Sequence, residues 1–213
     1  MPTVDQAKAW YPGYDAVHGF DHILRVLRMA ERLAVAEGAD LEIVRAAALL
    51  HDASGAETGG EGRAEHQHRS ADFAAEVLSA EGWAPERIEA VQHCIRAHRF
   101  RGNEAPQTLE AKIIFDADKL DVIGAFGVAR TLGYDVVMEW PFYAEVSDHF
   151  RNTGEKEAGE THSSYHEYLF KLSKIKERLF TQTARQIAEG RQKLMDRFFK
   201  QLDLEARGVD GGK

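Results

Sequence analysis

Histidine and aspartate residues that could carry chemistry gather in three short segments of this 213-residue chain. His22 stands in the segment DHILRV. The adjacent pair His51 and Asp52 ends the segment ALLHD, and Asp118 stands in the segment FDADKLD. Neutral imidazole and ionised carboxylate groups are both good ligands for divalent transition metals. The ten histidines of the chain are a first indication of a metal site or an acid–base site.

The adjacent pair His51 and Asp52 is the most informative of these segments. It directly follows the apolar run Ala46–Leu50, which reads as the end of a buried helix. Both side chains should therefore stand where the core meets a cavity. Leaving either polar group in an apolar wall without a partner is costly. A bound metal or a tight hydrogen-bond network would remove that cost.

His22 and Asp118 are each ambiguous when taken alone. A single histidine on an apolar helix face is usually a core residue with a hydrogen-bond partner. An aspartate flanked by other acidic residues is typical of a helix start, where the helix dipole favours negative charge. The presence of all three segments in one chain favours a shared metal site over these separate interpretations.

Helical periodicity dominates the chain and gives the elements that must position these residues. Apolar residues recur at helical spacing from Asp21 to Glu37. Gly38 is typical of a helix end, and Asp40 of the N-cap of a helix over 41–51. Further helices are predicted over about 67–80, 85–98, 108–120, 121–132, 164–179 and 181–205. Loops are predicted over 53–65, 99–107 and 133–160, and the last of these is a candidate lid.

No segment alternates between apolar and polar residues as a strand would, so the predicted fold class is all-α. The length fits one domain. We expect a single domain over residues 1–213, with its core over about 15–132 and a helical C-terminal extension over about 160–205.

Composition and charge limit the partners of this chain. Its net charge is −8 and its pI is about 5.7, so it lacks the basic surface that non-specific nucleic-acid binding needs. The apolar run Ala46–Leu50 is too short to span a bilayer, and the N-terminus has no secretory-signal pattern. The single cysteine, Cys94, cannot form an internal disulfide. We expect a cytoplasmic protein with no nucleic-acid or membrane partner. A homodimer stays open, because Phe198 and Phe199 could be core or interface.

The order H…HD…D, together with the flanking text DHILRV, ALLHD and FDADKLD, resembles the HD superfamily of metal-dependent phosphohydrolases. The phrases HRSADFAAEVL and THSSYHEYLFKL are similar to the small bacterial HD hydrolases of the YpgQ/YedJ-like type. The resemblance implies an HD-domain helical bundle with additional C-terminal helices. It also implies that His22, His51, Asp52 and Asp118 hold one divalent metal ion. Mn²⁺ or Mg²⁺ is the first expectation, and Ni²⁺, Fe²⁺ and Zn²⁺ also suit such ligands.

Superfamily members with two metals carry further histidines after the HD pair, and His68 and His98 fall at similar places here. We expect each to bind a second metal or the substrate phosphate, although both could be polar residues at the ends of surface helices. His66 and His93 are interpreted as non-functional. Asp116 and Asp121 are candidates for supporting or capping roles beside the ligand. Lys119, Arg69, Arg96, Arg99 and Arg101 are nearby cations, of which one or two could hold a phosphate.

The resemblance implies hydrolysis of a nucleotide or similar phosphorylated metabolite, and specifically a nucleoside triphosphate pyrophosphohydrolase. Asp52, His68, His98 and Lys119 are the candidate catalytic residues. Gly55 stands where HD nucleotidases that act on deoxynucleoside monophosphates have a glutamate, which argues against that activity. Two alternatives stay open. One is an HD-type oxygenase with two irons, and the other is a module that binds a nucleotide without hydrolysing it.

Overall fold

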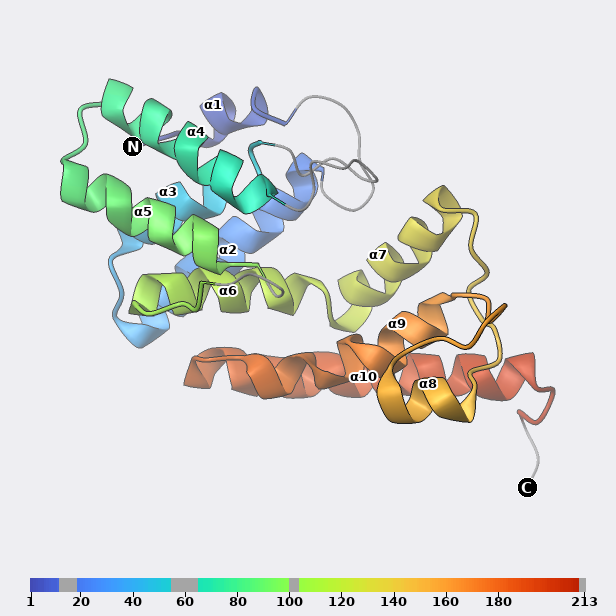
Figure 1. Ribbon diagram of the computed structural model, residues 1–213. Coiled ribbons are helices and arrows are strands. Elements are labelled where there is room, and N and C mark those ends of the chain that lie inside the picture. The colour runs from blue at the N-terminus through green and yellow to red at the C-terminus, as the bar shows by residue number, and fades with distance from the viewer. Residues whose placement is uncertain (12–18, 55–64, 100–103, 211–213) are drawn as a thin grey trace. The chain divides into compact units, whose positions relative to one another are not determined.

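A computed structural model describes residues 1–11, 19–54, 65–99 and 104–210 (Figure 1). All regular secondary structure in these ranges is helical, which confirms the all-α fold class. The chain divides into two compact units. Unit 1 contains Met1–Asp121 and Leu179–Ala184, and unit 2 contains Val122–Arg178 and Arg185–Lys213. The single domain predicted from the sequence stays a prediction. The division falls inside its predicted core, after Asp121.

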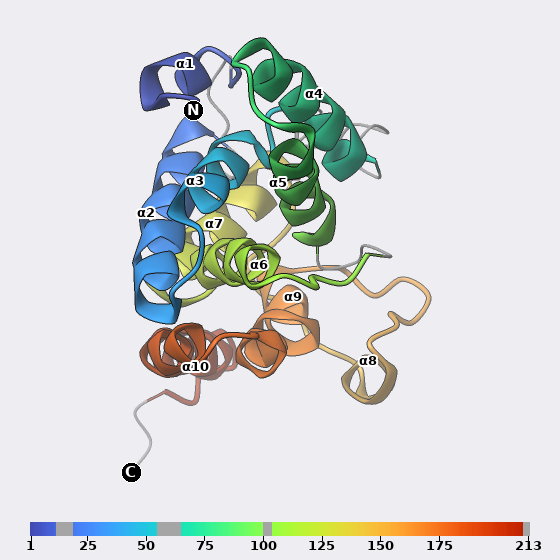
Figure 2. The same ribbon diagram turned by 90° about the vertical axis from the view of Figure 1, so that its left-hand side faces the viewer.

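The helices of unit 1 are α1 (Val4–Lys8), α2 (Phe20–Glu37), α3 (Leu41–Leu50), α4 (His66–Ala80), α5 (Pro85–Ala97) and α6 (Leu109–Asp121). Helix α3 packs between α2 and α5 (Figure 2), and α6 packs against α2, α3 and α5. The core between them is aliphatic, with fully buried Ile23, Leu33, Leu50, Ile95 and Ile114. Such burial stabilises each side chain by about 1.5–3 kcal/mol.

Two helical hairpins account for most of unit 1. Residues 38–40 join α2 to α3, and residues 81–84 join α4 to α5. Gly38 takes the left-handed conformation that ends α2, and the Asp40 side chain accepts hydrogen bonds from the backbone of Glu42 and Ile43 at the start of α3. Pro85 occupies the first turn of α5, where its missing N–H costs nothing. Short connections make each pair antiparallel, as Figure 1 shows for α4 and α5.

Within unit 1, Asp116 of α6 binds the segment Leu179–Ala184. Its carboxylate accepts hydrogen bonds from the backbone N–H groups of Phe180 and Thr181, at 2.9 and 2.7 Å, and from the Thr181 hydroxyl at 2.7 Å. The Phe180 ring also meets the Phe115 ring edge-on, with centroids 5.2 Å apart. Asp116 is therefore an anchor for a distant segment of the chain.

Unit 2 contains α7 (Gly124–Val137), α8 (Asp148–Thr153), α9 (Ser164–Phe170), the 3-10 helix η2 (Leu172–Arg178) and most of α10 (Gln182–Ala206). Asp135 of α7 accepts a hydrogen bond from Ser164 of α9. Tyr168 stacks on Phe199 of α10, with ring centroids 4.5 Å apart. Aromatic contacts and buried polar contacts therefore hold these helices together.

Several predicted boundaries differ from the structure. The helix predicted over 164–179 ends at Phe170 and continues as the 3-10 helix η2, and the predicted loop 133–160 contains the end of α7 and all of α8. Helix α1 was not predicted, because its five residues are too few to show periodicity. No helix in the described part of the chain is long and apolar enough to cross a membrane.

Candidate metal centre

Buried histidines and aspartates meet where the two hairpins of unit 1 open. His22 lies in the first turn of α2 and His51 directly follows α3, so the first hairpin brings both to its open end. His66 begins α4 and His98 directly follows α5, so the second hairpin does the same. The imidazole centroids of His22 and His51 are 5.5 Å apart, and so are those of His66 and His98. A centroid distance of 5.1 Å between His51 and His98 joins the two pairs.

Two aspartates complete two sets of three ligand groups. In the first set, formed by His22, His51 and Asp118, the ligand atoms lie within 4.8 Å of one another. Asp52, His66 and His98 form the second set with the same spacing. All six residues are buried, with at most 9% of each exposed. Atoms this close can share one ion or hold two.

Asp52 faces both sets. Its Oδ1 lies 3.4 Å from His66 Nε2 and 3.5 Å from His98 Nε2, whereas its Oδ2 lies 3.6 Å from His51 Nε2. Asp118 completes the first set, with its Oδ1 3.5 Å from His22 Nε2. One carboxylate with an oxygen toward each set is the arrangement expected of a group that bridges two ions.

The donor set fits a divalent metal. His51 Nε2 and Asp52 Oδ1 are buried and have no hydrogen-bond partner among the described residues. The Nδ1 atoms of three histidines face oxygen acceptors: Ala48 O for His51, Ile95 O for His98 and Asp121 Oδ2 for His22. A proton on each Nδ1 leaves the Nε2 lone pair directed into the site, where a metal needs it.

Charge in the site also suits a cation. Burial would by itself raise the pKa of the Asp52 carboxyl, but His51, His66 and His98 hold that pKa well below its ordinary value. Burial likewise opposes ionisation of Asp118, and Lys119 and His22 hold its pKa below the ordinary value. Burial lowers the pKa of His98, although Asp52 acts in the opposite direction. Ionised carboxylates and a neutral imidazole are the forms that bind a metal.

Comparison with known proteins agrees with this geometry. The HD domain family profile matches residues 19–123, which contain all six side chains. The protein YpgQ of Bacillus subtilis (strain 168) is 30% identical over 218 residues, which cover 99% of this chain and 97% of YpgQ. The chain belongs to the HD-domain family.

Solved structures of other proteins share the fold. The crystal structure of Bacillus subtilis YpgQ in complex with ADP has a TM-score of 0.74 and 29% identity, over 98% of this chain and 100% of that chain. A protein from Lactobacillus plantarum has a TM-score of 0.78 and 26% identity, over 98% and 100% of the two chains. An HD-superfamily hydrolase from Bacillus thuringiensis has a TM-score of 0.66 and 28% identity, over 96% and 94%.

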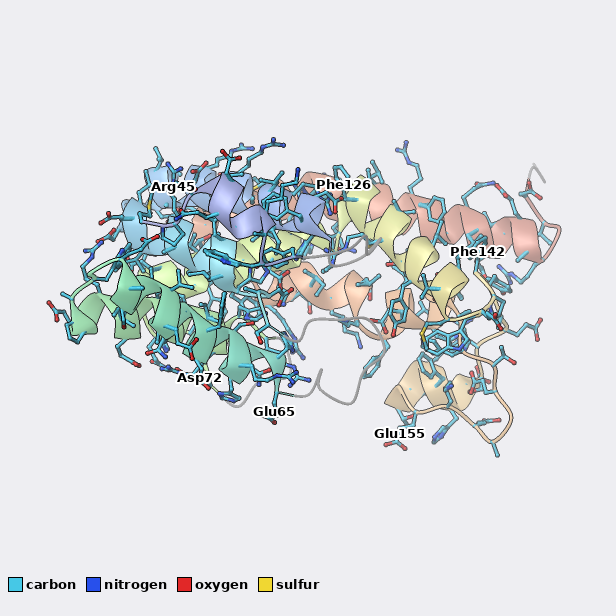
Figure 3. All side chains as sticks on the ribbon, turned by 90° about the horizontal axis from the view of Figure 1, so that it is seen from above. Arg45, Glu65, Asp72, Phe126, Phe142 and Glu155 are labelled. Carbon is cyan, nitrogen blue, oxygen red and sulfur yellow. The ribbon has the colours of Figure 1, made fainter. Side chains whose placement is uncertain are left out.

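The HD-domain structure brings together the four ligands predicted from the sequence, and it adds His66 and His98. His68, the residue expected to bind a second metal or the substrate phosphate, lies outside this group: its side chain is 52% exposed, and its Nε2 lies 3.7 Å from Glu65 Oε2. Figure 3 shows Glu65 at the start of α4. His66 was interpreted as non-functional, and the structure places it beside Asp52 and His98 instead.

Helical spacing could have separated these two histidines. His66 shares its face of α4 with Ser70, Ala74 and Leu78, at intervals of four residues, and all of these are buried. His68 shares its face with the exposed residues Asp72 and Glu76. His66 therefore lies on the buried side of α4.

The remaining candidates occupy varied positions. His93 is held by Glu104 and by the backbone N–H of Gln107, so protein groups use both ring nitrogens. Lys119 is buried, donates a hydrogen bond to Asp118 and lies over the Phe115 ring. Among the arginines, Arg96 pairs with Glu89 and Glu104, Arg69 is exposed, and Arg99 donates to Gln67 at 3.4 Å. Gly55 and Arg101 lie outside the described residues.

Proposed function

We propose that this HD-domain protein is a metal-dependent phosphohydrolase that acts on a nucleotide or a similar phosphorylated metabolite. Nucleoside triphosphate pyrophosphohydrolysis is the specific reaction that we propose. The observation that carries the proposal is the buried group of six side chains that could bind metal, in which His51 Nε2 and Asp52 Oδ1 have no hydrogen-bond partner among the described residues. The ADP complex of the relative YpgQ supports a nucleotide as the ligand class.

A divalent ion in such a site neutralises charge on phosphoryl oxygens and lowers the pKa of bound water. The first ligand set, with Asp52, would hold that ion. Asp52 offers an oxygen to each ligand set, so it can orient groups on both sides of the site. Lys119 compensates the charge of Asp118 and keeps this buried carboxylate ionised. Arg99 directly follows His98 and is only partly buried, so among the described residues it is our candidate to meet a substrate phosphate.

The test is release of phosphate or pyrophosphate from a panel of nucleoside mono-, di- and triphosphates, each assayed with Mn²⁺, Mg²⁺, Ni²⁺ and Fe²⁺. We expect His51→Ala and Asp52→Ala to reduce turnover by about 100-fold or more, because each removes a ligand from the ion that activates the reaction. The matched controls His149→Ala and Asp72→Ala change exposed residues and should keep wild-type turnover. Wild-type rates in the His51 and Asp52 variants would refute the proposal.

The second ligand set favours one further candidate. Because Asp52, His66 and His98 can hold an ion beside the first set, a centre with two irons that activates oxygen is the second candidate. Metal analysis of anaerobically prepared protein separates the two cases. Two irons per chain, with oxygen consumption and no phosphate release from any nucleotide, would favour the oxygenase.

A further inference from the structure

Each histidine that aims Nε2 at the centre needs an acceptor for its Nδ1 proton, and helix geometry supplies only some of these acceptors. The last carbonyl groups of a helix have no partner within the helix. His51 and His98 directly follow α3 and α5, and each finds such a carbonyl three residues earlier, at Ala48 and Ile95. These two histidines are therefore oriented by their own helices.

His22 has no such carbonyl available. It lies in the first turn of α2, where the unsatisfied backbone groups are N–H donors that cannot accept a hydrogen bond. Its Nδ1 instead lies 2.7 Å from Oδ2 of Asp121, the last residue of α6. The acceptor thus comes from a different helix, 99 residues further along the chain.

Arg25 fixes Asp121 in turn. Its Nε donates to Asp121 Oδ1 at 2.8 Å, and its Nη2 donates to Oδ2 at 3.0 Å, so the guanidinium holds the carboxylate through two bonds. Such paired bonds restrict both distance and orientation. The side chains of Asp121 and Arg25 are 5% and 17% exposed, so water competes little with these contacts. Arg25 also donates to Asp21, which holds its outer end.

Two residues of α6 therefore act on the two nitrogens of one imidazole. Asp118 and Asp121 are three residues apart and share a helix face. Asp118 lies beside Nε2 and Asp121 accepts from Nδ1. We propose that Asp121, held by Arg25, is a positioning residue that directs His22 Nε2 toward the metal. This inference rests on the metal site of the proposed function, but not on hydrolysis.

The test measures the affinity of the metal-free protein for Mn²⁺, from the electron paramagnetic resonance signal of the free ion. We expect Asp121→Ala to weaken Mn²⁺ binding by about 10- to 100-fold. Asp121→Asn keeps an oxygen acceptor and should lose less. The control Asp72→Ala should bind as the wild type does. Equal affinity of Asp121→Ala and the wild type, with affinity lost in His51→Ala, would overturn the positioning role and leave the proposed function standing.

A double-mutant cycle separates positioning from a structural role. Asp121 acts through His22, so Asp121→Ala should weaken Mn²⁺ binding in the wild-type background and change it less than twofold in the His22→Ala background. An equal loss in both backgrounds would mean that Asp121 supports the fold of the site in general, and would overturn the inference. Intact Mn²⁺ binding without nucleotide hydrolysis would instead refute the proposed function and leave this inference in place.

Discussion

The two oxygens of Asp52 lie near histidines of different candidate ligand sets, Oδ1 near His66 and His98 and Oδ2 near His51. His51, its neighbour in the chain, belongs to the first set, and His51 Nε2 lies 3.6 Å from Asp52 Oδ2. A carboxylate buried among imidazoles would be costly without a cation or protons nearby. The adjacent HD pair therefore joins the two halves of the site within two residues.

His66 and His68 offer a matched pair for testing the second ligand set. They lie two residues apart on α4, yet one is buried beside Asp52 and the other is exposed. We expect His66→Ala to lower metal-dependent turnover by about tenfold or more, because it removes a buried ligand, and His68→Ala to leave turnover within about twofold. Steady-state hydrolysis with saturating Mn²⁺ measures both. The reverse order of effects would restore the original prediction for His68.

At the scale of elements, the candidate ligands lie at or next to the ends of helices, and the interiors of the helices form the core. Helix α6 shows how one helix can divide its roles: Asp116 binds the segment at Phe180 and Thr181, Asp118 faces the centre, and Asp121 holds His22.

In unit 2, Glu160 holds several segments together in a similar way. Its carboxylate accepts from the Ser147 backbone and hydroxyl, from the Glu157 backbone and from His166.

Glu160 gives unit 2 a predicted acid sensitivity. The backbone N–H of Ser147, with that of Glu157, lowers the pKa of Glu160 to about 2 from its ordinary value of 4.5. A pKa lowered by folding contributes stability above pH 4.5, and that contribution is lost as the pH falls from 4.5 toward 2. Glu160→Gln should therefore lower the melting temperature at pH 7 and make its fall with acid shallower over this window.

Thermal unfolding monitored by circular dichroism at several pH values checks this expectation. Glu155→Gln is the control, because Glu155 is exposed in the same segment (Figure 3). Parallel pH curves for Glu160→Gln and the wild type would contradict the prediction.

Helix α7 contains a glycine pair that tests packing. A Cβ at Gly127 would lie 2.3 Å from the Val122 carbonyl oxygen and 2.7 Å from Met195 Cε, whereas a Cβ at Gly133 would meet no atom within 4 Å. Gly127→Ala should lower the free energy of unfolding by about 1–3 kcal/mol, since the backbone must shift. Gly133→Ala should raise it by about 0.5–1 kcal/mol through helix propensity. Urea denaturation measures both, and equal effects would contradict the proposed contacts.

At the scale of the whole molecule, all six candidate ligand residues belong to unit 1, in a stretch of the chain that begins at His22 and ends at Asp118. A ligand that binds only the folded state stabilises it by mass action. Metal binding should therefore stabilise the folded state of the whole stretch α2–α6, because no shorter part of the chain contains the complete site.

Removal of metal tests this coupling. At a free Mn²⁺ concentration of about 100 times the dissociation constant, the gain is about 2.7 kcal/mol, or roughly 5–10 °C in melting temperature for a chain of this size. A chelator should remove that gain, and added Mn²⁺ should restore it. His51→Ala should show no shift in either direction. A chelator-insensitive wild type, measured by differential scanning calorimetry, would contradict a metal site in the folded protein.

The sequence alone determined the all-α class, because helical periodicity is a local pattern. It also predicted His22, His51, Asp52 and Asp118 as metal ligands, through the HD pair and the resemblance that the flanking segments carry. It could also have selected His66 over His68, since the apolar face of α4 is visible in the spacing of Ser70, Ala74 and Leu78.

Only the tertiary structure decided which side chains meet. The contact of Asp121 with His22 spans 99 residues, and that of Asp116 with Thr181 spans 65. No local pattern encodes such pairs, because they depend on how α6 packs against α2 and on where the segment 179–184 returns to unit 1. The sequence therefore predicted four of the six side chains that the structure brings together. The folded chain decided that Asp52 stands between two sets of them, and which groups hold the histidines in place.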